Sequence, residues 1–483
     1  MFARHWAPRG LAAIPDAELD RLAELRFDYL WLMGVWTTGE LGRDIARQLF
    51  TSHSPSEIES SPYAIARYEV DPRYGGNDAL AELRRRLAKR NIGLIVDFVP
   101  NHTARDHDWI TSNPDIYIRE RGARRDQVGE IAYGRDPYFP PWTDTAQLDH
   151  RCVATRRVLI ETLQQIATQA DGVRCDMAML VLSDVFAKTW SHHQIMGADP
   201  ILYGDDNVAP APGVLARGEF WAEAIDAVRH DFIWIAEAYW GLEGRLQKLG
   251  FDYTYDKALY DHLLHGRPAQ IHAELATPIE YQRRCVRFLE NHDEPRLAAS
   301  LPPERAAAAL AIATTAPGMR FVHDGQIEGR RERATIQLAR RPDEATRPEQ
   351  RAGQTPFIEF TDQVSRGIEA MNESSFIQSV HERLLALPRA GDFALLPATD
   401  ERLVAYRWDD RNTPLVVVVN YSPDLVEANV TLEMHGLAGR RIELRDVLDG
   451  ATYEREGSAA LHVVLQPWQA HVFTVTTKGL WNG

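Results

Sequence analysis

The chain has 483 residues, of which 45% are hydrophobic and 25% are charged, close to the average of soluble globular proteins. This composition excludes an intrinsically disordered and a fibrous protein. The formal net charge of −15 argues against nucleic acid or an anionic membrane as a partner, because a polyanion would be repelled over most of the surface.

The N-terminal stretch MFARHWAPRG carries two arginines but no apolar segment behind them, and no stretch reaches the roughly 18 apolar residues of a membrane span. We therefore expect a cytoplasmic protein without a membrane partner. Cys152, Cys175 and Cys285 have no metal-ligand spacing, so we expect buried free thiols. The sequence leaves the oligomeric state open.

Helical patterns alternate with short apolar runs from residue 15 to about 325, which is typical of βαβ units around a parallel sheet. The expected strands lie at residues 30–36, 92–99, 171–177, 232–240, 251–256, 285–293 and 319–325. The pattern predicts a (β/α)8 barrel. Because only the short FARHW precedes the first helix, we expect the first strand to be shortened, irregular or missing.

Two segments depart from this alternation. The stretch 101–150 is rich in Pro, Asp and aromatic residues and is too long for an ordinary βα connection, so it predicts a small inserted subdomain. After about residue 390, alternating patterns with turns predict a C-terminal antiparallel β-sandwich. The predicted domains are a barrel formed by 1–100 and 151–389, the insertion at 101–150 and a β domain at 390–483.

Each expected strand ends in polar residues, and active sites of such barrels are built at the C-terminal strand ends. Four of these ends carry the segments DFVPNH (97–102), DGVRCD (171–176), IAEAYW around Glu237, and FLENHD (288–293). In type and order they resemble the four short motifs of the α-amylase family, glycoside hydrolase family 13. A single motif is a weak signal, but four in order on successive strands are specific.

The resemblance implies the chemistry of a retaining glycosidase. One carboxylate attacks the anomeric carbon, and a second, about 5–5.5 Å away, protonates the leaving oxygen. Asp176 takes the first role, and Arg174, two residues earlier on the same strand face, can keep it ionised. Glu237 takes the second role, for which we expect a raised pKa in apolar surroundings from Ile235, Ala236 and Trp240.

The other matching positions would surround one sugar ring. By the resemblance, Asp293 hydrogen-bonds sugar hydroxyls more tightly in the transition state, and His102 and His292 bind hydroxyls at the cleavage point. Tyr63 matches a tyrosine that stacks under the ring, and Asp97 supports the residues that touch substrate. In the competing interpretation each residue merely caps a helix or closes a surface ion pair. That interpretation is poor for the whole set.

The match departs from the family on the acceptor side. Many amylases have a Lys-His pair where this chain has Met179 and Leu180, and the eighth-strand loop reads PGMRFVHDGQIEGRR instead of a Pro- and Tyr-rich sequence. Contacts to the leaving group must therefore differ. Family members often bind Ca2+ through the asparagine that matches Asn101, but the insertion is short and has no dense run of oxygen ligands. The resemblance allows calcium, but we do not predict it, and no cofactor is required.

Two further groups of residues have two interpretations each. Arginines crowd the stretch after the eighth strand, where they indicate a solvated charged loop or, as the sharper hypothesis, a site for a phosphorylated sugar: Arg330, Arg331, Arg333, Arg340 and Arg341. Aromatic residues of the insertion either stack on glucosyl units or form the subdomain core: Tyr133, Tyr138, Phe139 and Trp142.

The leading hypothesis is a retaining α-glucosidase or amylase-like hydrolase that acts on short α-glucans or small glucosides. A transglycosylase or isomerase would use the same covalent intermediate and differ only in the acceptor. A third hypothesis is a noncatalytic carbohydrate-binding homologue. The segment FLENHDEPR, with Arg296, resembles exo-acting α-glucosidases more than endo-amylases.

Overall fold

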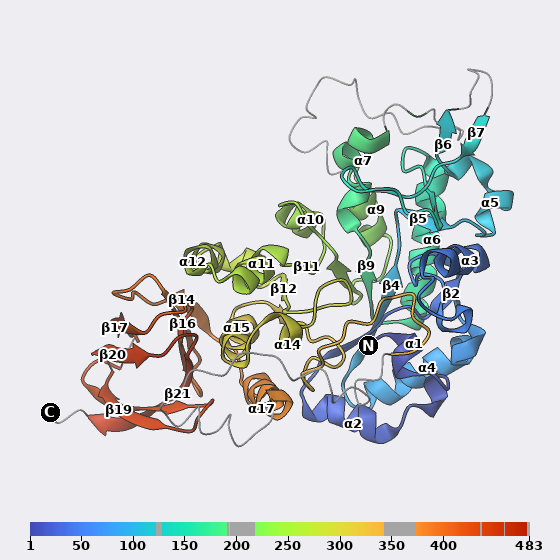
Figure 1. Ribbon diagram of the computed structural model, residues 1–483. Coiled ribbons are helices and arrows are strands. Elements are labelled where there is room, and N and C mark those ends of the chain that lie inside the picture. Colours follow the sequence, from blue (N-terminus) through green and yellow to red (C-terminus); the bar gives the residue numbers. More distant parts are fainter. Residues whose placement is uncertain are drawn as a thin grey trace. The chain divides into compact units, whose positions relative to one another are not determined.

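The computed structural model describes residues 1–121, 128–190, 193, 218–341, 373–434, 437–457 and 459–480 (Figure 1). Contacts divide the chain into two compact units, one of Met1–Tyr255 with Ala334–Arg341 and one of Asp256–Arg333 with Pro342–Gly483. This division falls inside the predicted barrel, so the three domain boundaries expected from the sequence stay a prediction. Each unit is described separately below.

The first unit is built on a parallel sheet with the strand order β1 (Tyr29–Leu32), β4 (Gly93–Phe98), β9 (Gly172–Cys175), β10 (Ile233–Ala236) and β11 (Tyr253–Tyr255). The register pairs Asp97 with Arg174, and Cys175 with Ala236. Since all these strands are parallel, their C-terminal ends lie at one edge of the sheet. This edge carries most of the predicted site residues.

The first barrel strand is reduced to a short pairing at the start of the chain. Phe2 forms a parallel bridge with Met33, the N–H of Ala3 donates to the Met33 carbonyl at 2.9 Å, and the N–H of Met33 donates to the Met1 carbonyl at 2.9 Å. The chain then turns into helix α1 (Ala3–Trp6). The expectation of a shortened first strand is confirmed.

Helices of the first unit bury apolar stripes. Helix α4 (Gly76–Ala88) buries Leu80, Leu83 and Leu87, which follow helical spacing. The other helices and short 3-10 turns are α2 (Asp16–Glu24), α3 (Glu40–Leu49), α6 (Val153–Gln169), α7 (Ser183–Trp190), α9 (Phe220–Asp226), α10 (Glu243–Lys248), η1 (Leu11–Ala13), η2 (Pro55–Glu57), η3 (Pro72–Tyr74) and η5 (Ala178–Val181). Strand β2 (Trp36–Thr38) pairs antiparallel with β3 (Ile65–Val70), with α3 and η2 between them in the chain.

The segment 101–150 leaves the sheet after β4 and returns before α6. Its ends are joined by the antiparallel pair β5 (His102–Ala104) and β8 (Thr145–Gln147), in which His102 stands opposite Gln147. Between them lie α5 (Trp109–Ser112), η4 (Pro114–Ile116) and the antiparallel pair of β6 (Arg119–Arg121) and β7 (Val128–Ile131). This closed base places His102 next to the end of β4.

The second unit begins with helices and a short parallel pair, β12 (Cys285–Arg287) and β13 (Met319–Arg320). Its helices are α11 (Lys257–His265), α12 (Pro268–Leu275), α13 (Ile279–Gln282), α14 (Leu297–Ser300), α15 (Pro303–Thr315) and α17 (Glu373–Leu385). The alanine-rich α15 is buried and is tied to the C-terminal strands, since the Tyr406 hydroxyl lies 2.7 Å from Thr315 Oγ1 and Trp408 Nε1 donates to the Thr315 carbonyl at 2.7 Å.

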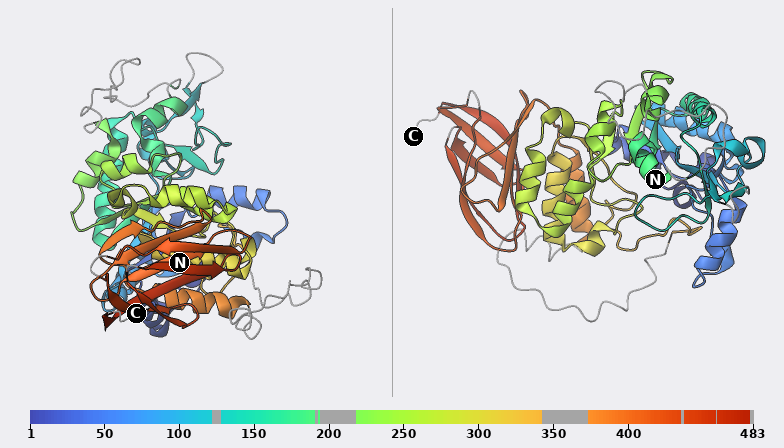
Figure 2. Two further views of the ribbon diagram at one scale, coloured as in Figure 1. Left: turned by 90° about the vertical axis from the view of Figure 1, so that its left-hand side faces the viewer. Right: turned by 90° about the horizontal axis from the view of Figure 1, so that it is seen from above.

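The C-terminal strands form an antiparallel six-stranded sheet and a two-stranded sheet, drawn in orange to red in Figure 2. The larger has the order β14 (Asp392–Leu395), β15 (Leu403–Asp409), β16 (Leu415–Asn420), β21 (Ala470–Leu480), β18 (Arg440–Asp446) and β19 (Thr452–Glu456). The smaller pairs β17 (Val426–Thr431) with β20 (Ala460–Leu465). Both sheets contribute to one apolar core, which contains Val418 of the larger sheet and Val430 and Leu465 of the smaller one.

The fold class predicted from the sequence, a (β/α)8 barrel followed by a C-terminal antiparallel β domain, is confirmed. The later barrel strands lie where we expect them, but they are shorter, because polar residues such as Glu237 and Asp293 leave the sheet and enter loops. The three cysteines are free and buried, as expected. Among the described residues, no helix has the length and apolar character that crossing a bilayer requires.

Candidate active site

One buried guanidinium joins two of the predicted catalytic carboxylates in the first unit. Arg174 Nη1 lies 2.7 Å from Asp176 Oδ1, and Arg174 Nη2 lies 2.8 Å from Glu237 Oε2. The backbone fixes this arrangement, since the Glu237 N–H donates to the Cys175 carbonyl and the Ala178 N–H donates to the Glu237 carbonyl, both at 3.0 Å. All three side chains are buried, so a single guanidinium faces two carboxyl groups away from water.

Aromatic rings surround the Arg174 guanidinium. Its central carbon lies 5.1 Å from the ring centre of Trp31, 5.2 Å from that of Tyr63 and 5.6 Å from that of Tyr255. Burial alone would lower the pKa of Arg174, but Glu237 and the other nearby acidic groups raise this pKa well above its usual range. Arg174 therefore stays a cation, held in place by rings that have little freedom to move.

The carboxylate of Glu237 has polar contacts on both oxygens. Oε2 accepts from the backbone N–H of Met177 at 2.7 Å in addition to its ion pair with Arg174, and Oε1 accepts from the Tyr239 hydroxyl at 2.9 Å. The expectation of apolar surroundings is therefore wrong for the atoms that contact this carboxylate. The error arises because Arg174 and Met177 reach it from the neighbouring strand end, which the local sequence around Glu237 does not reveal.

Asp97 is hydrogen-bonded to Trp31, whose ring lies against the Arg174 guanidinium. Its carboxylate accepts from the Trp31 indole N–H at 3.0 Å and from the backbone N–H of Gly34 at 2.6 Å, and the side chain is fully buried. Gly34 has a φ of 71°, and a Cβ there would lie 2.7 Å from the Phe2 ring, so this position requires glycine. The predicted role of Asp97 in supporting the residues that touch substrate stays a prediction.

His102 and Tyr63 lie in the same unit. Burial lowers the pKa of His102 to about 3, opposed by a hydrogen bond to the backbone of Tyr63, so the imidazole is neutral at ordinary pH. The His102 ring centre lies 5.2 Å from that of Trp142. The half-buried Tyr63 ring contacts Arg174, which connects His102 with the cluster of Arg174, Asp176 and Glu237.

His292 and Asp293 lie in the second unit and contact each other. His292 Nε2 is 3.0 Å from Asp293 Oδ2, and the Asp293 side chain is 43% exposed. Asn291 Oδ1 accepts from the backbone N–H groups of Asp293 at 2.8 Å and Glu294 at 2.9 Å, which fixes the turn that presents this carboxylate. The prediction that Asp293 acts together with Asp176 and Glu237 stays a prediction.

A buried ion pair that the sequence analysis missed closes the loop around Asp293. Glu290 Oε1 lies 2.6 Å from Arg296 Nη1, and Glu290 Oε2 accepts from the Leu297 N–H at 2.6 Å. Arg296 also donates to the Asp324 carbonyl at 2.7 Å. Burial raises the pKa of Glu290 to about 7, against the opposing effect of Arg296. The only signal in the sequence was an acidic residue inside the apolar run before Asn291.

The residues expected on the acceptor side lie in the first unit, together with Glu237, and they differ in burial. Met179 and Leu180 are buried in η5, so they form core contacts in place of the polar pair found in many amylases. Of the four aromatic residues of the insertion, Trp142 packs on His102, and Tyr133 carries the Arg105 guanidinium 4.4 Å from its ring centre. Tyr138 and Phe139 are 59% and 67% exposed, and Lys188 Nζ lies 4.9 Å from the ring centre of Tyr138.

Tyr138 is held next to the loop that follows Glu237. Its ring meets the ring of Trp240 edge to face at 4.9 Å, and its hydroxyl accepts from Lys188 Nζ at 3.2 Å. The buried Asp136 fixes the turn below, since its Oδ1 accepts from the N–H groups of Tyr138 at 2.6 Å and Phe139 at 2.9 Å. Trp240 has a φ of 66°, an unfavourable conformation for a large side chain that clusters at functional sites.

The arginines after the eighth strand do not form one group. Arg331 pairs with Glu373 at 3.2 Å, with both side chains largely exposed, and Arg333 Nε donates to the His292 carbonyl at 3.3 Å. Arg340 is exposed and belongs to the first unit. These contacts favour the charged loop over a phosphate site, which stays a hypothesis.

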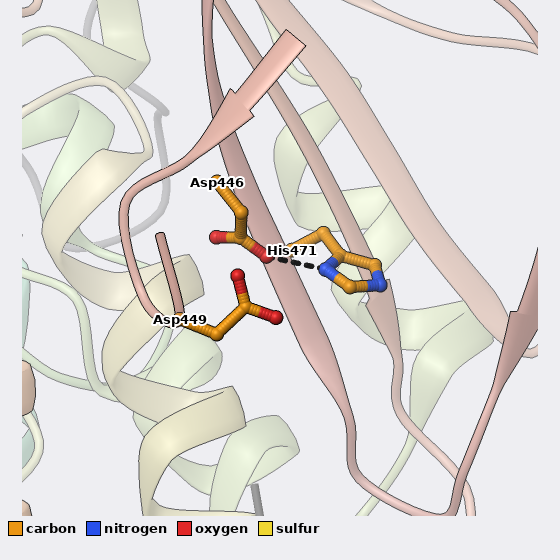
Figure 3. A group of neighbouring side chains, drawn as sticks. All are labelled: Asp446, Asp449 and His471. Carbon is orange, nitrogen blue, oxygen red and sulfur yellow. Dashed lines mark hydrogen bonds and ion pairs between the residues drawn. The ribbon is translucent and has the colours of Figure 1, made fainter. Parts of the chain in front are cut away.

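One group in the described part of the chain has the composition of a metal site. Asp446, Asp449 and His471 bring their ligand atoms within 4.8 Å of one another at the turn between β18 and β19 (Figure 3). However, Asp446 Oδ2 bonds His471 Nδ1, and Asp446 Oδ1 accepts from the Leu448 N–H at 2.9 Å. The buried aspartate is thus used in closing the turn.

Comparison with known proteins accords with this geometry. The model of the α-amylase catalytic domain matches residues 16–126. Alpha-amylase MalA of Haloarcula japonica is 26% identical over 321 residues, which are 66% of this chain and 42% of that protein. Oligo-1,6-glucosidase IMA5 of Saccharomyces cerevisiae is 31% identical over 94 residues, 19% of this chain and 13% of that protein. The chain is thus similar to proteins of the α-amylase family.

Solved structures of α-amylases show the same fold. The maltogenic α-amylase AmyB of Thermotoga neapolitana has a TM-score of 0.67 and 20% identity, covering 98% of this chain and 97% of that chain. An α-amylase of Lactobacillus plantarum has a TM-score of 0.66 and 21% identity over 98% and 97% of the two chains. By contrast, the chain spans less than half the length of the curated α-amylase family relatives that it matches.

Proposed function

We propose that the chain is a retaining glycoside hydrolase that cleaves α-glucosidic bonds of short α-glucans or small α-glucosides through a covalent glycosyl-aspartate intermediate. The observation that carries this proposal is the buried Arg174 guanidinium, which bridges Asp176 and Glu237. Double displacement at an anomeric carbon requires two carboxyl groups, and here both lie next to one permanent cation at the same strand edge.

In the first step, Asp176 attacks the anomeric carbon while Glu237 protonates the leaving oxygen. The positive charge of Arg174 favours the ionised form of Asp176, which is the nucleophile. Glu237 Oε1 is bonded by Tyr239 rather than by the guanidinium. A tyrosine hydroxyl both donates and accepts, so it can stay bonded to this oxygen in either protonation state of Glu237. In the second step, Glu237 removes a proton from water, which attacks the glycosyl-aspartate.

The remaining residues would hold the sugar ring. A neutral His102 imidazole can bond a hydroxyl without adding charge, and Tyr63 offers an aromatic face next to Arg174. We assign to Asp293 and His292 the hydroxyl contacts that tighten as the ring flattens toward an oxocarbenium ion. Asp293 suits this role because its exposed carboxylate is fixed by the Asn291 turn.

The exposed rings Tyr138 and Phe139, with Trp240, support a glucan chain on the acceptor side, since sugar rings stack on aromatic faces. Names of similar proteins point the same way, because they include an α-amylase, an oligo-1,6-glucosidase and an α-glucosidase. A transglycosylase would use the same residues and differ in whether water or a sugar hydroxyl ends the reaction. The experiment below distinguishes the two.

The test is product analysis by NMR with maltose, maltotriose, sucrose and trehalose offered separately. We expect glucose or maltose released first as the α-anomer, and Asp176→Asn should lose this activity by about a thousandfold or more, because its nucleophile is removed. Asp231→Asn, on an exposed aspartate, is the matched control and should remain active. Initial release of the β-anomer would contradict a retaining mechanism. If neither wild type nor Asp176→Asn forms product from any of the four sugars, the proposal that the chain is an enzyme is wrong.

A further inference from the structure

The carboxamide of Gln147 fills an oxygen-lined position at the base of the insertion. Gln147 ends β8 opposite His102, and its side chain is fully buried, as is that of Asn101. Gln147 Nε2 donates to the Asn101 carbonyl at 2.9 Å, to Asn101 Oδ1 at 3.0 Å and to the Leu148 carbonyl at 3.0 Å. In return, Asn101 Nδ2 donates to Gln147 Oε1 at 3.2 Å.

The oxygens at this position are of the kind that bind a hard cation. The Gln147 amide nitrogen, a hydrogen-bond donor, lies among them. An amide nitrogen has two hydrogens, yet Nε2 faces three oxygens at about 3 Å, so the surroundings are richer in acceptors than the amide needs. Converging carbonyl and carboxamide oxygens are ligands that Ca2+ prefers. The asparagine that resembles a calcium ligand of the family is therefore already bonded, through its Oδ1, to a neutral N–H donor.

Two carboxylates of the insertion are used in other contacts. Asp149 pairs with Arg151 through both oxygens, at 2.8 and 2.7 Å, and Asp136 Oδ1 accepts the two N–H groups of the Tyr138 turn. A calcium site needs six to eight oxygens and usually several negative charges. The described residues around Asn101 thus do not fit a calcium ion while Gln147 keeps its amide.

We propose that the Gln147 carboxamide takes the place of a cation at this position, so that the base of the insertion is held without Ca2+. The hydrogen bonds of one side chain join the end of β4 to the end of β8, a connection that an ion would otherwise make. This inference is independent of the proposed function, because it concerns how the fold is held.

The same network positions His102. Asn101 Nδ2 lies 3.3 Å from His102 Nδ1, and an amide nitrogen can only donate, so His102 Nδ1 is the acceptor. The neutral ring then carries its proton on Nε2. Gln147 is thus a positioning residue that sets the tautomer of His102 through Asn101.

The first test compares the melting temperature of the wild-type chain in millimolar EDTA and in millimolar CaCl2. We expect no difference. A melting temperature that rises in CaCl2 for wild type, and no longer rises in Asn101→Ala, would overturn the proposal, because the cation would then bind at this position. Histidine 15N chemical shifts give a second readout, in which a protonated Nδ1 on His102 would contradict the network.

The second test converts the position into the site that it resembles. Gln147→Glu keeps the size but replaces the donor with a carboxylate that faces three oxygens, so it should melt lower in EDTA by about 5 °C or more and recover in CaCl2. Gln147→Met removes the donor without adding charge, and it should melt lower under both conditions. Gln164→Glu, at an exposed amide on α6, is the surface control and should change little.

If Gln147→Glu folds only when CaCl2 is present during refolding, that outcome supports the proposal in its strongest form. If CaCl2 rescues Gln147→Met as well as Gln147→Glu, the rescue does not depend on the new carboxylate, and the proposal is wrong.

Discussion

Two regions of the molecule use a buried arginine and a carboxylate in different ways. In the first unit, Arg174 pairs directly with Asp176 and Glu237, the carboxylates to which we assign the chemistry. In the second unit, Arg296 pairs with Glu290, and the proposed catalytic residue Asp293 is exposed on the loop that this pair closes. Under the proposed function the first arginine tunes the reacting groups, whereas the second holds a loop in shape. Substitutions in the two regions should therefore differ in what they change first.

The largest effect should come from Arg174→Met. It leaves two buried carboxylates without their cation, and breaking a buried pair on one side costs about 3–5 kcal/mol. We expect this loss in the free energy of unfolding, measured with urea, together with a fall in kcat of about a hundredfold or more on maltotriose. Arg331→Met removes an exposed arginine and should change neither quantity much. Wild-type stability in Arg174→Met would show that the two carboxylates do not depend on this charge.

An intermediate effect should come from Glu290→Gln, with pH as the distinguishing variable. The pKa of Glu290 is raised to about 7 in the folded chain, above its usual value of 4.5, because the group is buried. The folded state therefore holds a proton that the unfolded state releases. The stability that this gives is fully present below pH 4.5 and is lost as the pH rises through about 7, by up to about 3 kcal/mol.

Glu290→Gln should remove this pH dependence, because the introduced amide does not titrate. The measurement is urea unfolding of wild type and variant at several pH values from 4 to 8. Glu280→Gln, at an exposed glutamate of the same unit, should keep the wild-type pH dependence. Identical curves for wild type and Glu290→Gln would show that Glu290 does not change its protonation in this range.

The smallest effect should come from Tyr138→Ala, which changes an exposed ring and not a buried charge. Loss of one stacking face should lower kcat/KM for maltotriose by about 1 kcal/mol, or roughly fivefold, with little change in stability. Hydrolysis of an aryl glucoside, which has no second sugar ring, should be less affected. Phe139→Ala tests the neighbouring ring. Equal losses for both substrates would remove the acceptor-side assignment.

Trp240→Gly separates strain from binding at the same place. Glycine adopts the φ of 66° without cost, so we expect stability to stay the same or rise by about 1 kcal/mol, while activity on maltotriose falls because the ring is lost. The two measurements are urea unfolding and kcat/KM. A loss of stability would show that the Trp240 ring contributes more to packing with Tyr138 than its backbone costs.

The chemistry of single strands was predictable from the sequence. Arg174 and Asp176 are two residues apart on β9, and the period of a strand puts both side chains on one face, where they form the expected pair. The barrel, the antiparallel C-terminal strands and the shortened first strand also follow from local patterns. Each of these features depends on residues that are close in sequence, or on the alternation of helical and strand patterns along the chain.

Contacts between distant segments were not predictable. The Arg174 contact with Glu237 depends on the register of β9 against β10, and the bond between Asn101 and Gln147 joins residues 46 positions apart. The choice between core and surface for Tyr133 and Tyr138 likewise depends on Arg105 and Lys188, which reach them from other segments. The periodicity of a single segment does not predict such contacts, because they form only when the register between neighbouring strands is fixed.

The three buried thiols have a practical consequence. Cys175 lies between Arg174 and Asp176, and burial raises the pKa of its thiol well above the usual range, against the opposing effect of Arg174. All three cysteines are buried, so thiol reagents should ignore the native chain. Cysteines introduced at Asp231 and Glu280, whose side chains are 77% and 84% exposed, would then accept fluorescent or spin labels selectively. One label in each unit would allow the distance between the two labels to be measured with and without sugar.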